Sequence, residues 1–134
     1  MVATIDVFDT EALLIFYLGE EGAEVVEDLL RRIQNKETKG FLNIVNLTEF
    51  YYILYRRDAA IAEEKVRNLR AYGMEIVPII DNAIWREAGK IKGEHAISLA
   101  DAFAVATAMA KGDKLVVGRD DDFKKVSVPL IKVR

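Results

Sequence analysis

Short apolar runs and helical stripes alternate along this chain of 134 residues. The runs are rich in β-branched and aromatic residues and are too short for helices, so they predict strands. We expect these strands at 2–8, 41–45, 74–79, 115–117 and 126–133, with a turn at 38–40. Between them, apolar residues recur every three or four positions, as on one face of a helix. These stripes predict helices at 11–19, 20–35, 47–57, 59–73, 84–93 and 99–112.

A chain that alternates strands with helices builds a parallel sheet, because parallel neighbours need crossover connections. The strand runs are uniformly apolar, so helices are expected to cover both faces of the sheet. The sequence therefore predicts an α/β fold, a three-layer α/β/α sandwich around a mainly parallel sheet of about five strands. No repeat, linker or low-complexity segment interrupts the pattern, so residues 1–134 are expected to form a single domain.

Composition narrows the chemistry that this chain can perform. It has no cysteine and one histidine, His95, which excludes disulfides, thiolate zinc sites, a cysteine nucleophile and paired-histidine sites. The 22 acidic residues exceed the 19 Lys and Arg residues, and the net charge is −3. Bulk charge therefore does not predict a broadly basic nucleic-acid-binding face. Carboxylates and hydroxyls remain as the main reactive groups.

No segment of the sequence predicts a leader or a membrane span. The first ten residues carry Asp6 and Asp9 where a secretory leader carries basic residues. No uncharged apolar stretch reaches the roughly 18 residues that a spanning helix needs. We therefore expect a cytoplasmic protein with no membrane partner.

Two long stretches carry a single charge each, although 31% of all residues are charged. Glu49 is the only charged residue from 40 to 55, and Asp101 is the only one from 96 to 110. The helix around Asp101 is apolar nearly all round, which marks a buried helix. A carboxylate in such a place costs several kcal/mol unless it is paired, hydrogen-bonded or bound to a metal.

Helix capping is one explanation for these isolated acids. Asn46 with Glu49 and Ser98 with Asp101 have the spacing of capping boxes, and Asp9 fits an N-cap. Carboxylates in a first helical turn are also favoured by the helix dipole.

Position in the fold favours a shared role for the acids. Asp9 follows the first strand, Glu49 follows the second by a few residues, Asp101 opens the last long helix, and Asp120 follows the fourth strand beside Asp121 and Asp122. In a parallel sheet these positions share the carboxyl edge, where the acids repel one another and raise one another's pKa values. Mg²⁺ or Mn²⁺ relieves such repulsion and activates water for phosphodiester hydrolysis. Asp6 faces away from Asp9 by strand alternation, and we interpret it as structural.

Four segments resemble the motifs of the PIN-domain ribonucleases, in particular the VapC-type toxins of toxin–antitoxin pairs. They are VFDTEALL at 7–14 with Gly19-Glu20 and Gly22-Ala23-Glu24 after it, NLTEFYY at 46–52, LADAF at 99–103 and VVGRDDDF at 116–123. They follow the family's order along the whole chain. Gly118 departs from the family, in which a Ser or Thr is common there. This argues against a hydroxyl contact at that position and leaves the carboxylate set untouched.

The resemblance implies a divalent-metal-dependent endoribonuclease with Mg²⁺ or Mn²⁺ as cofactor. It implies a catalytic cluster of Asp9, Glu49, Asp101 and Asp120, and metal ligands Asp9, Asp101, Asp120 and Asp122. Thr10 is expected to bind a metal-bound water or a phosphate, and Arg119 to contact an RNA phosphate. The resemblance also implies a homodimer and a small VapB-like antitoxin, which we expect to place a basic side chain near the acids.

Two other functions fit the same residues. A non-catalytic PIN-like interaction module keeps the fold and uses its edge for binding, and it predicts neither cleavage nor a metal effect on melting temperature. A structure-specific DNA nuclease uses the same acidic site, because the metal chemistry alone does not distinguish the two sugars.

Overall fold

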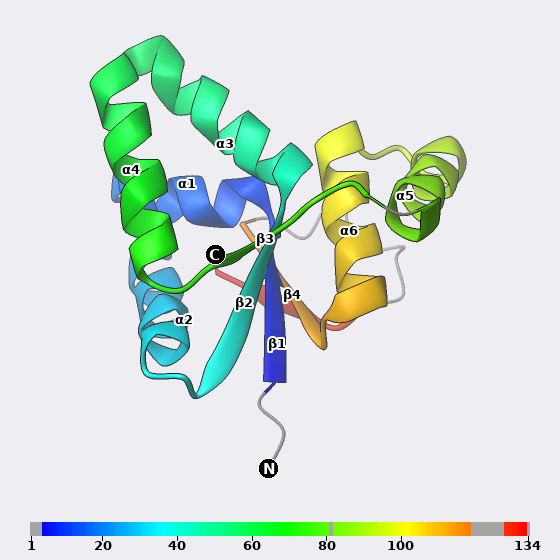
Figure 1. Cartoon of the computed structure of the whole chain (residues 1–134), viewed down its shortest axis with the longest axis horizontal. Helices are drawn as coiled ribbons and strands as arrows, with labels where there is room; N and C mark the ends of the chain where they lie inside the picture. Colours follow the sequence, from blue (N-terminus) through cyan, green and yellow to red (C-terminus); the bar gives the residue numbers. More distant parts are fainter. Residues whose placement is uncertain (1–3, 81, 119–127, 134) are drawn as a thin grey trace.

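Within residues 4–80, 82–118 and 128–133, which the computed structural model describes, five strands form one parallel sheet in the order β3-β2-β1-β4-β5 (Figure 1). The strands are β1 (Thr4–Phe8), β2 (Thr38–Asn43), β3 (Glu75–Val77), β4 (Lys114–Val117) and β5 (Leu130–Lys132). The same described residues form six helices, α1 (Thr10–Leu18), α2 (Ala23–Gln34), α3 (Ile44–Arg57), α4 (Ala59–Ala71), α5 (Asn82–Glu94) and α6 (Leu99–Lys111). The predicted α/β fold with a parallel sheet is confirmed.

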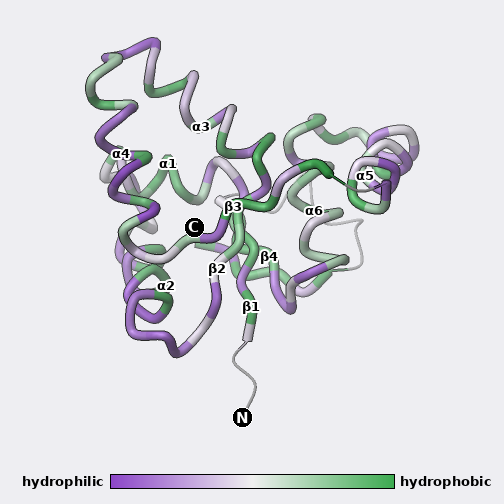
Figure 2. Tube along the Cα trace, in the orientation of Figure 1, coloured by the Kyte–Doolittle hydropathy of each residue, from purple (hydrophilic) through white to green (hydrophobic). Residues whose placement is uncertain are grey.

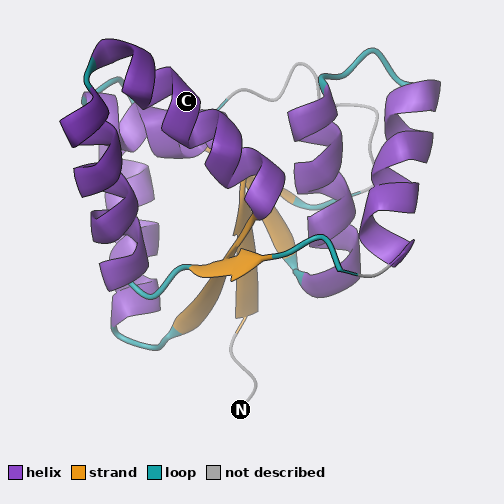
Figure 3. Cartoon of the chain, turned by 45° about the horizontal axis from the view of Figure 1, so that its top comes forward, coloured by secondary structure: helices purple, strands orange, loops and turns teal. Residues whose placement is uncertain are grey.

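Strand alternation divides the interior into two cores, one on each face of the sheet. Phe8 and Val116 pack against α1, α2, α3 and α4, whereas Val7, Leu115 and Val117 pack against α5 and α6. Figure 3 shows these two groups of helices on opposite sides of the strands. The three-layer arrangement follows because each central strand, β2, β1 and β4, contributes apolar side chains to both cores.

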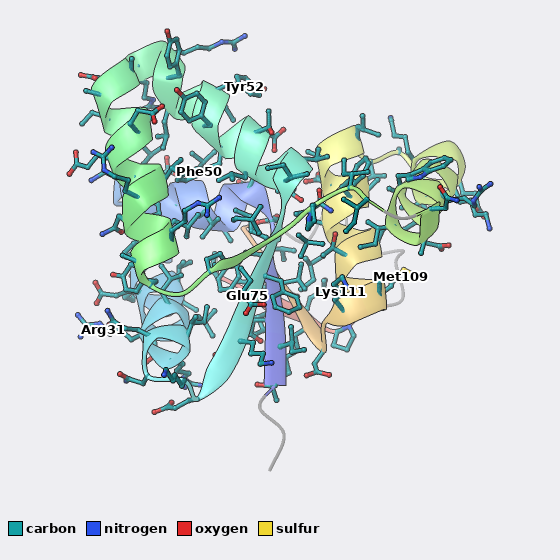
Figure 4. The ribbon with its side chains drawn as sticks, viewed as in Figure 1. Arg31, Phe50, Tyr52, Glu75, Met109 and Lys111 are labelled. Atoms are coloured by element: carbon teal, nitrogen blue, oxygen red, sulfur yellow. The ribbon has the colours of Figure 1, made fainter. Side chains whose placement is uncertain are left out.

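The helices differ in how much of their surface is buried. In α6 every residue from Ala102 to Ala108 is buried, while α2 and α4 present long hydrophilic faces (Figure 2). Helix α3 is intermediate, because Phe50 is fully buried on its inner face and Tyr52 is 42% exposed (Figure 4).

None of the described helices is long and apolar enough to cross a membrane.

The strand order places a topological switch point between β1 and β4. The chain runs outward from β1 through β2 to β3, and then returns to the other side of β1 with β4 and β5. In open parallel sheets, ligands bind outside the carboxyl ends of the strands at such a point. Asp9 directly follows β1 and Gly118 directly follows β4, so both lie at this position.

The second strand differs from its prediction at both ends. The residues 38–40, expected as a turn, are paired with β1 through Gly40 opposite Asp6. Gly40 fits there because a Cβ atom would overlap the Ile33 side chain of α2, so the turn signal reflects close packing. At the other end α3 begins at Ile44, so Val45 is helical and not in the strand.

The remaining boundaries follow the predictions within a few residues. The third strand is shorter than expected, at Glu75–Val77. The fifth lies at Leu130–Lys132, and residues 126 and 127 of its predicted span lie outside the described residues. Helix α1 ends at Gly19, which has the left-handed φ of 68° that glycine accommodates.

Close packing at Gly40 predicts that Gly40→Ala destabilises the protein. The added methyl would overlap Ile33 Cδ1 and lie 3.2 Å from the Met74 sulfur, and such overpacking costs about 1–3 kcal/mol. Urea unfolding followed by circular dichroism measures the change.

Gly89→Ala is the matched control, because Gly89 lies within α5 and a Cβ there meets nothing within 4 Å. This variant is expected to gain about 0.5–1 kcal/mol from helix propensity. An unfolding midpoint for Gly40→Ala at or above that of the native chain would contradict the packing argument.

Candidate active site

Asp9 lies at the switch point and is 1% exposed. It is the N-cap of α1, where its Oδ1 accepts a hydrogen bond of 2.7 Å from the Ala12 N–H. Its own N–H donates to the Val116 carbonyl of β4 at 3.0 Å. The carboxylate is therefore fixed by β1 before it, α1 after it and β4 beside it.

Burial raises the pKa of Asp9 well above its usual 3.8, because the surroundings disfavour the charged form. The neighbouring charges of Asp101 and Glu11 raise this pKa further, while the N–H groups of Ala12 and Gly118 lower it. The fold thus brings two acids predicted for the site, Asp9 and Asp101, within electrostatic reach of each other.

Asp101 lies in the first turn of α6 and is half-buried. The Ser98 side chain is the N-cap of this helix and accepts a hydrogen bond of 3.1 Å from the Asp101 N–H. The predicted N-cap at Ser98 is confirmed. This hydrogen bond is one half of the predicted capping box, and it fixes the backbone of Asp101 at the start of α6.

Glu49 lies in the second turn of α3 and is half-buried. The capping box expected from Asn46 and Glu49 is wrong, because α3 starts three residues earlier than that box requires. Asn43 is the N-cap, and its Oδ1 accepts a hydrogen bond of 2.8 Å from the Val45 N–H. Glu49 therefore has no capping role.

Asn46 joins three helices at the carboxyl edge of the sheet. It is fully buried, and its Nδ2 donates to the Thr10 Oγ1 at 3.3 Å and to the Ala100 carbonyl at 3.0 Å. The Thr10 hydroxyl donates in return to the Asn46 carbonyl at 3.3 Å. Figure 1 shows the starts of α1, α3 and α6 meeting here, above the central strands.

Thr10 was predicted to contact a metal-bound water or a phosphate. The structure buries Thr10 to 3% exposure and engages its hydroxyl with Asn46 as both donor and acceptor. Its contact with substrate stays a prediction. The sequence analysis did not predict the hydrogen bonds between Thr10 and Asn46. The one indication of them in the sequence is that Asn46 is a polar residue on the buried face of α3.

Glu11 is a further acid at this edge that the sequence analysis did not single out. A Cβ atom on Gly118 would lie 2.5 Å from Glu11 Cγ and 2.9 Å from its carboxyl carbon, so Glu11 lies over the glycine. This explains the departure at Gly118, because the space that a Ser or Thr side chain needs is filled by Glu11. The indication of this contact in the sequence was the glycine at position 118, where the family commonly has Ser or Thr.

The described residues supply part of the predicted ligand set. Arg119, Asp120, Asp121 and Asp122 lie outside the described residues, so their roles stay predictions. Within 4–80, 82–118 and 128–133, no group of three His, Cys, Asp or Glu residues is placed to hold a metal ion. The pair of mutually repelling carboxylates, Asp9 and Asp101, nevertheless fits a hard divalent cation, which prefers oxygen ligands.

A cavity of about 470 Å³ lies elsewhere, at the amino end of β2. It is lined by Ile33, Thr38, Gly40 and Tyr72, among others. Because β1 and β2 run parallel, this cavity is at the opposite end of the sheet from Asp9. Cavity size therefore does not mark the acidic site.

The chain belongs to the PIN-domain family, whose model matches residues 7–129. This confirms the family that the four motifs indicated. Ribonuclease VapC42 from Mycobacterium tuberculosis is 29% identical over 130 residues, which cover 91% of this chain and 95% of that protein. The VapC ribonuclease Mb2780c from Mycobacterium bovis matches to the same extent.

Solved structures share this fold at lower sequence identity. VapBC2 from Rickettsia felis, bound to a DNA fragment from its promoter, aligns with a TM-score of 0.76 at 16% identity and covers 96% of this chain and 98% of that one. A toxin–antitoxin complex from Klebsiella pneumoniae aligns with a TM-score of 0.72 at 16% identity over the same shares. VapC20 from M. tuberculosis, a sarcin-ricin loop cleaving toxin, aligns with a TM-score of 0.69 at 15% identity, over 93% and 97% of the two chains.

The buried charge at Asp9 predicts that Asp9→Asn stabilises the metal-free protein at neutral pH. Asn keeps a capping oxygen and carries no charge, and a single stabilising substitution commonly gains roughly 0.5–2 kcal/mol. The folded-state pKa is raised above 3.8, so the native chain loses stability as pH rises through that folded pKa. Melting temperatures in EDTA, at pH 7 and below 3.8, measure the gap between the two proteins.

Asp58→Asn is the control, because Asp58 caps α4 at an exposed position. Asp58→Asn therefore changes an N-cap residue from Asp to Asn without removing a buried carboxylate. A gap for Asp9→Asn that stays constant with pH would contradict the assigned cost of burying the Asp9 charge.

Proposed function

We propose that this chain is a divalent-metal-dependent endoribonuclease and the toxin of a VapBC-type toxin–antitoxin pair. The observation that carries the proposal is the buried Asp9 carboxylate beside Asp101 at the switch point of a PIN-domain fold. Relatives that match nearly the whole chain are named VapC ribonucleases. Burying a carboxylate beside a second acid costs free energy when no metal is bound. A role in metal-assisted phosphodiester hydrolysis would explain why the chain keeps an acid there.

The metal would be Mg²⁺ or Mn²⁺, held by Asp9 and Asp101 together with Asp120 and Asp122. When bound, it lowers the pKa of water and neutralises charge on the phosphate oxygens. The chain's own groups orient this chemistry. The N–H groups of Ala12 and Gly118 favour the ionised form of Asp9.

Glu49 completes the proposed catalytic set with Asp9, Asp101 and Asp120. From its half-buried position on α3, the Glu49 carboxylate accepts the proton that the attacking water releases. The water oxygen bonds to phosphorus, the bond to one ester oxygen breaks, and that oxygen leaves with a proton. Arg119 binds a phosphate oxygen of the RNA, and Thr10 adds a hydroxyl beside Asp9.

The proposal includes a partner and a location. Several structures with this fold are toxin–antitoxin complexes, which supports a small VapB-like antitoxin for this chain. Its basic side chain would occupy the acidic edge and compete with the metal. We also propose a homodimer that acts in the cytoplasm, where RNA and antitoxin are available.

Asp101→Asn is expected to lower RNA cleavage at least about 100-fold, because it removes a carboxylate ligand of the cation that would neutralise charge on the phosphate oxygens. Cleavage of a labelled single-stranded RNA is measured with Mn²⁺ and with Mg²⁺. Asp28→Asn is the matched control, since Asp28 is an exposed residue of α2 that pairs with Arg32 at 3.1 Å, and surface pairs contribute little. Equal rates for the native chain and Asp101→Asn would overturn the catalytic assignment.

The two alternatives are separated by the metal and by the nucleic acid. A metal that binds the folded state raises the melting temperature by mass action. No Mn²⁺ effect on melting together with no cleavage would favour the interaction module. Cleavage of branched or gapped DNA in preference to RNA would favour the DNA nuclease.

A further inference from the structure

Asn46 is buried between the start of α1, where Asp9 lies, and the start of α6, where Asp101 lies. Thr10, which accepts one of its hydrogen bonds, directly follows Asp9. Ala100, whose carbonyl accepts the other, directly precedes Asp101. One side-chain amide therefore connects the residue after one acid to the residue before the other.

The bonding of this amide is uneven. Both Asn46 N–H groups have partners, whereas its Oδ1 is buried without a hydrogen-bond partner among the described residues. A buried unpaired acceptor costs about 1–3 kcal/mol. An apolar side chain of the same size would avoid that cost, but it would leave Thr10 and Ala100 without the hydrogen bonds that Asn46 donates.

Electrostatic repulsion explains why the starts of α1 and α6 need to be held together. Asp9 is the N-cap of α1 and Asp101 lies in the first turn of α6, and Asn46 bonds to the residues next to both. Two like-charged carboxylates at neighbouring helix starts repel each other when no cation lies between them. Repulsion acts to separate the first turn of α6 from the start of α1. The hydrogen bonds of Asn46 to Thr10 and to Ala100 oppose that separation.

A second asparagine in the same segment gives a comparison within the molecule. Asn43 is also fully buried, and its Nδ2 donates to the Thr107 hydroxyl of α6 at 2.9 Å. Thr107 in turn donates to the Phe103 carbonyl at 2.7 Å. Asn46 therefore links α3 to α6, and Asn43 links the end of β2 to α6 at Thr107, six residues after Asp101.

We propose that Asn46 is a positioning residue that holds the first turn of α6, with Asp101, against the start of α1, with Asp9, so that both carboxylates could bind one divalent cation. The proposal rests on the function proposed above. Side chains that orient metal ligands typically change metal affinity or activity by about 10- to 100-fold when they are replaced. Asn43 has no such role and serves fold stability alone.

The test compares Asn46→Ser with Asn43→Ser. Serine at 43 keeps an N-cap oxygen and loses only the bond to Thr107, whereas serine at 46 is too short to reach both Thr10 and Ala100. Both variants are expected to melt at lower temperatures than the native chain. Only Asn46→Ser is expected to bind Mn²⁺ about 10- to 100-fold more weakly, measured by calorimetry on metal-free protein.

Kinetics and hydrogen exchange add readouts that a loss of stability does not reproduce. At a fixed, subsaturating Mn²⁺ concentration, Asn46→Ser should lower kcat with little change in KM for RNA, and added Mn²⁺ should restore part of the rate. In metal-free protein the Ala102 amide, which bonds to the Ser98 carbonyl, should exchange faster in Asn46→Ser and not in Asn43→Ser. Asn46→Leu, which fills the same space, is the second variant should the serine variant fail to fold.

The outcomes separate this inference from the function beneath it. Native Mn²⁺ affinity and kcat in Asn46→Ser, beside an active native chain, would overturn the positioning role alone. Equal loss of Mn²⁺ affinity in both serine variants would also overturn it, because the loss would then follow stability. A native chain that neither binds Mn²⁺ nor cleaves RNA overturns the proposed function and this role with it.

Discussion

The buried carboxylate of Asp9 is the constraint on which the rest of this structure depends. It caps α1, its backbone bonds to β4, and its side chain lies within reach of Asp101 on α6. A charge so far from water needs nearby groups that offset the lost hydration. The N–H groups of Ala12 and Gly118 provide part of that offset, and their positions set how α1 leaves β1 and where β4 ends.

A second buried acid shows what distinguishes a structural carboxylate from a candidate functional one. Asp6 is 3% exposed, and burial raises its pKa. The positive charges of Lys114 and Arg32 lower this pKa, while the negative charge of Asp113 raises it. Asp6 therefore meets cations supplied by its own chain. Among the residues that the structure describes, the charged groups that act on Asp9 are both acids, Asp101 and Glu11. The sign of the neighbouring charge, not burial, singles out Asp9 as a residue that an external cation would stabilise.

The order of elements and the parallel sheet could be predicted because both follow from local apolar patterns and crossover geometry. The position of Asp9 at the carboxyl edge of the sheet could be predicted from its place directly after a strand. Other features depended on contacts distant in sequence. Gly40 looked like a turn because its packing partner, Ile33, lies on another element. Asn46 looked like a cap because its true partners, Thr10 and Ala100, are 36 and 54 residues away. Capping rules use local spacing alone, so they selected the wrong asparagine.

The net negative charge of the chain has a different consequence at the carboxyl edge of the sheet than it has when averaged over the whole surface. A net charge of −3 opposes a polyanion when it is spread evenly over a surface. Here, however, Asp9 and Asp101 lie together, with Glu11 acting on Asp9. A divalent cation bound among them is the largest local charge and inverts the electrostatic logic of its surroundings. Affinity for RNA phosphates would then depend on the metal rather than on a basic surface. The same carboxylates that would repel RNA in the metal-free protein would favour its binding once a cation is held among them.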